Sequence, residues 1–210
     1  MKTLITSIAG AATIALVSCE NPADNSSAAK TGEAKDVPTG SASGSKWVFT
    51  NDSKIDFVGS KVTGSHDGGF KSFTGHFHID GDTLAESGHR IEIDMNSTWS
   101  DNDKLTEHLK APDFFNVEEF PTSSFTATGL RESKDGEDGT HQLTGNFKLH
   151  GVEKSIEFPV TVVQTEDKVE IDADFFINRF DYDIKYEGMK DDLIRKEVVI
   201  KLDLTAVPAS

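Results

Sequence analysis

Cysteine is almost absent from this sequence of 210 residues, and basic side chains are few. The single cysteine, Cys19, excludes an intrachain disulfide and any zinc or iron–sulfur site built from several thiolates. Lysine and arginine total 21 against 36 aspartates and glutamates, which gives a formal net charge of −15. Because proteins bind the nucleic-acid backbone mainly through clustered lysine and arginine, this balance argues against nucleic acid as a partner.

Familiar catalytic motifs are missing as well. The chain contains no Gly-x-Ser-x-Gly, His-Glu-x-x-His or Gly-x-Gly-x-x-Gly sequence and no phosphate-binding loop. Hydrolase, zinc-protease and nucleotide chemistry therefore have no basis in the sequence. The carboxylates are many but scattered, as is typical of a solvated surface. We expect a protein that is not an enzyme and that carries no resident metal or cofactor.

The first 18 residues have the composition of a targeting segment. Lys2 precedes an apolar stretch of about 14 residues, which is shorter than the roughly 20 needed to span a bilayer. This predicts a signal peptide over residues 1–18. Leu16-Val17-Ser18-Cys19 resembles the lipobox of bacterial lipoproteins, so we favour a lipid attached to Cys19 over a chance cysteine at an ordinary cleavage site. We expect an exported, membrane-anchored lipoprotein of the cell envelope, facing the periplasm or the outside.

Residues 19–45 contain no aromatic side chain, and Val37 is their only large aliphatic one. A segment so poor in apolar side chains cannot offset its ordering entropy, so we expect a disordered tether behind the lipidated cysteine. As a random coil it would reach roughly 28 Å. All 14 phenylalanines and both tryptophans and tyrosines follow residue 46, which predicts a folded domain over residues 46–208.

Apolar and polar residues alternate with a period of two along most of this domain. Phe73, Phe77 and Ile79, for example, alternate with polar or small residues. This pattern is typical of antiparallel strands with one buried face. Eight such runs separated by turn sequences predict an all-β, eight-stranded antiparallel barrel, with a two-sheet sandwich as the alternative. One short helix is expected near residues 101–111, capped by Ser100 or Asp101.

The inward faces of the predicted strands carry many phenylalanines and isoleucines. They could surround a ligand with a long apolar tail, at a gain of about 0.8 kcal/mol for each buried CH₂ group. They could instead fill the barrel as a core, which is the more common role of such a stripe. Small inward residues such as Gly75 and Gly145 either leave room for a ligand or mark bends that let the barrel close. The candidate ligand-binding residues are Phe57, Phe73, Phe77, Ile91, Ile93, Phe125, Phe147, Phe158, Phe175 and Ile200.

Several segments together resemble the YceI-like family of bacterial lipid-binding proteins. They include Ile-Asp-Phe-Val-Gly-Ser-Lys at 55–61, His-Leu-Lys-Ala-Pro-Asp-Phe-Phe-Asn-Val-Glu-Glu-Phe-Pro at 108–121 and Phe-Lys-Leu-His-Gly-Val-Glu-Lys at 147–154. The resemblance covers Trp47 to about Ala206. It implies a lipocalin-like barrel whose apolar interior takes a polyisoprenoid, an isoprenoid quinone precursor or a fatty-acid-like lipid. Phe147 stands where the family commonly has an aliphatic residue, and it would narrow such a cavity.

The segment that follows the predicted helix is expected to gate one end of the barrel. An arginine at the end of an apolar strand could also meet the polar headgroup of a ligand. Arg179 is the candidate, although it could instead be a structural residue paired with Asp181 or Asp183. The mouth and headgroup candidates are His108, Phe114, Phe115, Phe120 and Arg179.

Two other classes of function fit the sequence. His76 and His78 share an outward face and could chelate a transition metal in an enzyme, although two solvated histidines are the simpler interpretation. The chain could also be an interaction module of the envelope with a filled core and a membrane-protein partner. The leading prediction is storage or transport of a long-chain amphiphile, with the membrane and this lipid as partners.

Overall fold

The computed structural model describes residues 20–37, 44–81 and 83–209. The predicted signal peptide and Cys19 lie outside the described residues, as do residues 38–43 of the predicted tether. In the part of the chain that is described, no helix is both long and apolar enough to cross a membrane.

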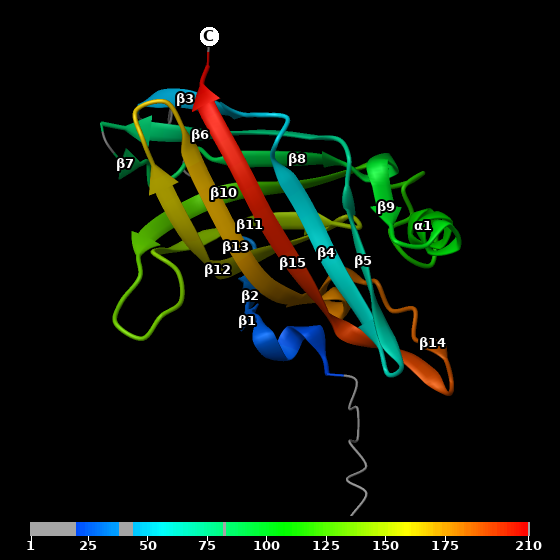
Figure 1. The fold of residues 1–210 in the computed structure, drawn as a ribbon. Coiled ribbons are helices and arrows are strands. Elements are labelled where there is room, and N and C mark those ends of the chain that lie inside the picture. The colour runs from blue at the N-terminus through cyan, green and yellow to red at the C-terminus, as the bar shows by residue number, and fades with distance from the viewer. Residues whose placement is uncertain (1–19, 38–43, 82, 210) are drawn as a thin grey trace, which may run out of the picture.

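Eight antiparallel strands close into a barrel (Figure 1). Three of them are bent and consist of two pieces each, namely β3 with β4, β5 with β6, and β8 with β9. The long strand β15 pairs with β13 along one edge and with β4 and then β3 along the other, which completes the ring. The barrel strands are β3 (Ser45–Phe49), β4 (Lys54–Lys61), β5 (Gly64–Phe70), β6 (Phe73–Asp80), β8 (Arg90–Asp94), β9 (Thr98–Ser100), β10 (Thr122–Glu132), β11 (His141–Leu149), β12 (Val152–Gln164), β13 (Val169–Asn178) and β15 (Asp192–Pro208).

Short elements surround this ring. They lie at its ends and along one side. The core lies inside the barrel and is built from the inward residues of all eight strands. The predicted barrel is confirmed, and the sandwich alternative is wrong because β13 pairs with β15 over its whole length. The short elements are η1 (Pro22–Asn25), β1 (Ser27–Ala28), β2 (Lys30–Glu33), β7 (Thr83–Leu84), η2 (Met95–Ser97), α1 (Asp103–Lys110), η3 (Arg179–Tyr182) and β14 (Gly188–Met189).

The predicted helix is present, but its cap differs from the expectation. Asn102 caps α1, and its side-chain oxygen accepts a hydrogen bond from the backbone N–H of Leu105 at 3.1 Å. Asp101 is engaged elsewhere, because its carboxylate accepts a hydrogen bond from the backbone N–H of Asp67. The hydroxyl of Ser100 donates to the carbonyl of Asn102. The cap therefore moves to the next residue with a suitable side chain.

Two glycines on inward faces make room for the ring of a neighbouring strand. A Cβ atom added at Gly145 would lie 2.3 Å from the Phe125 ring, and one at Gly68 would lie 2.4 Å from the Phe57 ring. Such contacts are shorter than any ordinary packing distance. These glycines therefore leave no space for a ligand, because a phenylalanine already occupies it.

Replacing Gly145 with alanine is expected to lower the free energy of unfolding by about 1–3 kcal/mol, because the added methyl group overpacks the core. Gly59→Ala is the matched control, since a Cβ atom there would meet no atom within 4 Å. Urea unfolding followed by tryptophan fluorescence measures both. Equal stabilities for the two variants would contradict the close approach of Phe125 to Gly145.

The segment of residues 20–37, here called the strap, lies against the barrel (Figure 1). The prediction of a disordered tether is wrong for these residues. β1 pairs in parallel with β13, and β2 pairs in an antiparallel fashion with β12. The strap has few apolar side chains and buries little apolar surface. Its backbone hydrogen bonds to strand edges supply the stabilisation that holds it in place.

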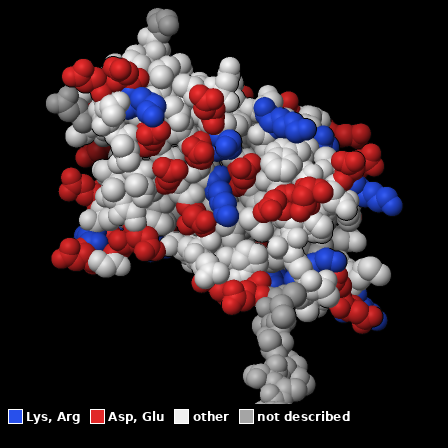
Figure 2. Space-filling view, in the orientation of Figure 1, with Lys and Arg blue, Asp and Glu red and all other residues white. Residues whose placement is uncertain are grey.

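Charged side chains of both signs are interspersed over the face shown in Figure 2, with the acidic ones in excess. Most ion pairs on the described surface have a side chain that is at least one third exposed, as in Arg90 with Glu92. Such pairs add little stability. The excess of acid is therefore a property of the outside, and the inside of the barrel is where a binding site must be sought.

Candidate ligand-binding site in the barrel

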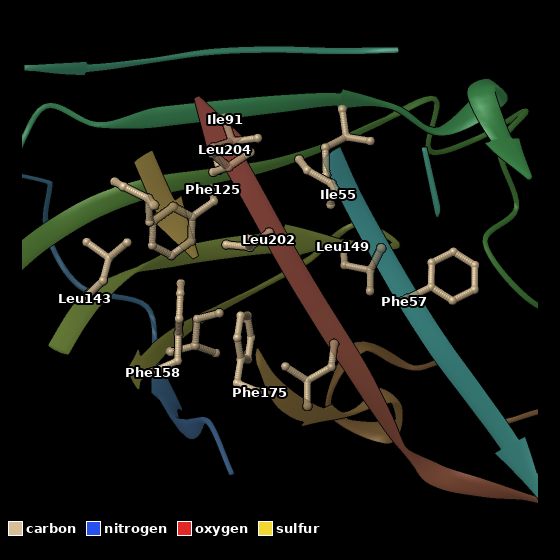
Figure 3. Close-up of a cluster of buried hydrophobic side chains, with 14 of the residues drawn as sticks. Ile55, Phe57, Ile91, Phe125, Leu143, Leu149, Phe158, Phe175, Leu202 and Leu204 are labelled. Atoms are coloured by element: carbon tan, nitrogen blue, oxygen red, sulfur yellow. The ribbon is translucent and has the colours of Figure 1, made fainter. Parts of the chain in front are cut away.

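The first of two apolar cavities inside the barrel has a volume of about 70 Å³. The rings of Phe158 and Phe175 stack against each other beside it, with centroids 4.0 Å apart and planes inclined by 16°. Figure 3 shows these two rings together, with Phe57 set apart from them. The cavity is lined by Ile55, Phe70, Phe77, His89, Ile91, Ile93, Phe125, Leu143, Phe147, Ile156, Phe158, Ile171, Phe175, Ile200, Leu202 and Leu204.

The second cavity has a volume of about 90 Å³ and lies at the end of the barrel that carries α1 and η3. Leu109 of α1 and the two rings that follow this helix form one side of it. Its lining includes Phe57, Phe70, Ile93, Leu109, Phe114, Phe115, Phe147, Leu149, Ile177, Arg179, Ile184, Ile194, Val198 and Ile200.

Four residues border both cavities, so the two spaces adjoin. These residues are Phe70, Ile93, Phe147 and Ile200, and they come from four different strands. The Phe147 ring also packs edge-to-face on Tyr182, with centroids 5.3 Å apart. The interior thus holds two adjoining apolar cavities, and these four side chains narrow the passage between them. This matches the expectation that Phe147 would narrow a cavity.

The structure brings together nearly all the predicted ligand-binding residues. Every candidate except Phe73 borders one of the two cavities. Phe73 packs on Phe49, with ring centroids 6.2 Å apart, and borders an open polar groove that also contains Lys46 and Arg90. Its parity is the same as that of Phe77, but the bend between β5 and β6 takes it away from the closed interior.

Three of the predicted mouth residues meet above or inside the second cavity. Phe114 and Phe115 line it, and Phe114 is only 6% exposed. His108 packs on Phe114 and on Tyr186, with ring centroids 5.0 and 4.9 Å away, and its Nε2 atom lies 2.8 Å from the Asp113 carboxylate. These aromatic rings cover the cavity where α1 meets the segment that follows η3.

Phe120 is not part of this cover. Its ring packs on His150, with centroids 4.7 Å apart, and lies against the turn at Gly151. Gly151 has a φ angle of +75°, and a Cβ atom there would come within 2.6 Å of the Phe120 ring. Phe120 thus packs on the turn between β11 and β12, which explains its position without a ligand.

Arg179 is buried, with 3% of its surface exposed, and its guanidinium is held by backbone carbonyls. Nε donates to Arg195 O at 3.0 Å, and one terminal nitrogen donates to Ile184 O at 2.6 Å. The other terminal nitrogen donates to Tyr186 O at 2.7 Å and Ile194 O at 3.2 Å. Burial lowers the pKa of this guanidinium, and the nearby charge of Glu187 opposes that shift.

The expected partners of Arg179 therefore differ from those found. Neither Asp181 nor Asp183 accepts a hydrogen bond from it, and Asp183 instead pairs with Lys185 at 2.6 Å. The guanidinium joins η3 to β15 across the end of the second cavity. Because at least four of its N–H directions are used, it is poorly placed to bind a headgroup, and a structural role accounts for its burial.

Several lining residues were not among the candidates. Ile55, Leu202 and Leu204 have the inward parity of their strands, so alternation alone identifies them. His89 and Phe70 have no such signal, because each lies beside a bend or just before a strand. Their positions depend on how the chain turns, and the local sequence does not specify that.

His89 is the one titratable side chain in the lining of the first cavity. Its exposed fraction is 2%, its Nε2 atom lies 2.7 Å from Ala85 O, and its Nδ1 atom lies 3.2 Å from the backbone nitrogen of His78. Because the His78 N–H can only donate, Nδ1 accepts and Nε2 carries the proton. Burial lowers the pKa of His89 to about 4, so the ring is neutral near pH 7.

The outward pair His76 and His78 packs edge-to-face, with ring centroids 5.2 Å apart. Burial lowers the pKa of His76, and the nearby charges of Lys46, His78 and Arg90 lower it further. In the described ranges, no three His, Cys, Asp or Glu side chains come close enough together to hold a metal ion. The pair therefore has no third ligand among these residues.

Comparison with known sequences finds one family. The model of the YceI-like domain matches residues 47–206. A UPF0312 protein of Pseudomonas putida is 30% identical over 94 residues, which are 45% of this chain and 47% of that protein. A UPF0312 protein of Azotobacter vinelandii is 30% identical over 123 residues, 56% of this chain and 62% of that protein. The chain thus spans about half the length of the curated relatives it matches.

Solved structures share the fold. BcnA of Burkholderia cenocepacia superimposes with a TM-score of 0.62 at 22% identity, over 74% of this chain and 96% of that one. A domain of Saccharophagus degradans described as polyisoprenoid binding gives 0.61 at 16% identity, over 79% and 99%. A YceI protein of Campylobacter jejuni gives 0.52 at 20% identity, over 68% and 85%. At these identities the similarity concerns the fold alone.

Proposed function

Because the chain belongs to the YceI-like family, we propose that it binds a long-chain amphiphile inside the barrel and performs no catalysis. The observation that carries this proposal is the pair of adjoining cavities, which share four apolar residues and are lined mostly by aliphatic and aromatic side chains. The description of the Saccharophagus domain as polyisoprenoid binding supports the same class of ligand. A polyisoprenoid, an isoprenoid quinone precursor or a fatty-acid-like lipid has a suitable tail.

The tail must displace side chains in order to enter. The cavities measure about 70 and 90 Å³, and a dry cavity that admits benzene measures about 150 Å³. Phe147 and the other three shared residues are the ones whose movement would join the two spaces. Each buried CH₂ group contributes about 0.8 kcal/mol, so a long tail can offset the cost of moving them.

The proposed location is the cell envelope. The signal-like residues 1–18 and the lipobox-like sequence before Cys19 support export followed by acylation of this cysteine. A protein anchored in this way would store or carry its lipid beside the membrane from which that lipid comes. Loss of the mature chain from the detergent phase on Cys19→Ala substitution is the expected sign of acylation.

Binding is tested with the full chain and geranylgeraniol, a C20 isoprenoid alcohol, by native mass spectrometry. We expect a one-to-one complex, and we expect Phe147→Trp to weaken it at least about tenfold because the larger ring fills the junction between the cavities. Phe180→Trp is the matched control, because Phe180 is 37% exposed and borders neither cavity.

Two results would contradict the proposal. One is a folded wild-type chain that takes up no geranylgeraniol and no C16 to C18 fatty acid. The other is equal affinity in the Phe147→Trp and Phe180→Trp variants, which would place the lipid outside the barrel.

A further inference from the structure

The wall of the barrel is incomplete between β12 and β13. These strands pair only near their hairpin, from Thr161–Gln164 to Val169–Asp172. Beyond that point β13 pairs with β15 and β12 pairs with β11, but β12 and β13 no longer pair with each other. The strap occupies the interval, with β1 on β13 and β2 on β12. Figure 1 shows β1 and β2 beside these two strands.

The lining of the first cavity lies directly behind the strap. Ser27 is the register partner of Phe175, and Thr31 is the register partner of Ile156. Phe175 and Ile156 both line the first cavity. An outer groove with a volume of about 530 Å³, bordered by Ser27, lies beside the strap and shares Leu202 with that cavity. Removal of the strap would therefore expose the interior of the barrel to the side.

The strap is held mainly by polar contacts at the surface. Lys30 pairs with Glu157 at 2.7 Å, and Lys154 pairs with Glu33 at 2.9 Å, and each pair has one side chain that is more than two thirds exposed. Exposed pairs of this kind contribute little to stability. Backbone hydrogen bonds at strand edges, such as Ala29 N–H to Phe176 O at 2.9 Å, complete the attachment. Segments with few buried apolar contacts are the ones that open locally.

Two contacts fix the ends of the strap. Near its start, Ala23 is 5% exposed and packs on Val58 and Val199, which point outward from the barrel. Near its end, the side chain of Asn146 accepts from Lys35 N–H at 2.9 Å and donates to Lys35 O at 2.6 Å. Both contacts are small enough to break without disturbing the barrel itself.

We infer that the interval between β12 and β13 is the side entrance through which an apolar tail reaches the cavities, and that the strap closes it. This inference rests on the proposed lipid binding. The chain from Cys19 to Pro22 spans at most about 10 Å, so an acyl group on Cys19 would hold the entrance close to the bilayer. The lipid can then pass sideways from the membrane to the interior when the strap detaches.

The experiment locks the strap. Gly32 and Ser155 are register partners in the antiparallel pair of β2 and β12, and a Cβ atom at Gly32 meets no atom within 4 Å. In the full chain carrying Cys19→Ala, Gly32→Cys with Ser155→Cys should form a disulfide across this pair. Ser124→Cys with Lys148→Cys, between β10 and β11, is the matched control in an intact part of the wall.

The readout is the rate at which the protein takes up parinaric acid, a fluorescent C18 fatty acid. We expect oxidation to slow uptake by at least about tenfold in the strap-locked protein, because local opening is then blocked. Reduction should restore the rate, and oxidation of the control pair should leave it unchanged. The affinity at equilibrium should be the same in all forms, because the lock leaves the cavities intact.

The outcomes separate the entrance from the binding itself. Tight binding with the same uptake rate in locked and unlocked protein would overturn the entrance and leave lipid binding in place. Equal slowing by the control disulfide would also overturn it, because the effect would then follow from stiffening the barrel. Absence of binding in every form would remove both proposals.

A second variant guards against failure of the disulfide to form. Ala23→Asp places a charge on the outward apolar patch of Val58 and Val199 and should loosen the strap. We expect faster uptake, together with faster hydrogen exchange at the Ala29 amide. Faster exchange without faster uptake would overturn the inference.

Discussion

Replacement of Arg179 by methionine is expected to lower the free energy of unfolding by about 3–5 kcal/mol, because four backbone carbonyl groups, one buried and three partly buried, lose their charged donor. Arg179→Lys should fall between this variant and the wild type, since an ammonium group cannot reproduce the planar fork. Urea unfolding followed by tryptophan fluorescence measures the change. Arg131→Met is the matched control. Because the Arg131 side chain is 37% exposed in its pair with Glu137, this substitution should lower the free energy of unfolding by less than about 1 kcal/mol.

The same variants separate the two roles considered for Arg179. A structural arginine predicts a large loss of stability and, in whatever fraction stays folded, lipid affinity close to that of the wild type. An Arg179→Met protein of normal stability that has lost lipid affinity would contradict the structural role and favour contact with a headgroup.

Acidification from pH 7 to pH 4 is expected to remove about 3 kcal/mol of stability through His89 alone. Burial lowers the pKa of this histidine from 6.5 to about 4 in the folded protein. Between these two values the unfolded chain binds a proton that the folded chain does not, so stability falls as the pH falls. The loss begins near pH 6.5 and is complete near pH 4. A proton on Nδ1 would also face the N–H group of His78.

A His89→Gln variant should lose less stability over this pH range than the wild type, by about the same 3 kcal/mol. The comparison cancels the contributions of the many surface carboxylates, whose environments the substitution leaves alone. His141→Gln is the matched control, since His141 is half-buried at the start of β11 and contacts Thr140. Parallel stability curves for the wild type and His89→Gln would contradict the burial of a neutral His89.

The sequence predicts the barrel and much of its interior because alternation is a local property. Phe125, Phe158 and Phe175 each lie in a run of period two, and each faces the first cavity. The helix is predictable for the same reason, within two residues of its cap. Where the chain bends, as it does beside Phe73, parity no longer tells which side chains reach the closed interior.

Alternation does not predict the strap or the surroundings of Arg179, and the physical reason is different. Both depend on backbone groups, and any residue offers the same N–H and C=O groups to a strand edge or a guanidinium. Asn146 illustrates the difficulty, because it lies on the outward face of β11 and is nevertheless 5% exposed under the strap. In the sequence, Asn146 resembles any other polar surface residue. Only the structure shows that its side chain binds the backbone of Lys35.

The position of β15 in the ring has a consequence for the kinetics of folding. Its register partners are Val48 and Val58 on one edge and Phe176 on the other, so the ring closes through contacts between segments far apart in the chain. Such contacts are formed late and slowly, because a long loop must close before they contribute. Until then β3 and β4 present an unpaired edge that invites pairing with other chains. Shielding of this edge until β15 docks would therefore favour folding over aggregation.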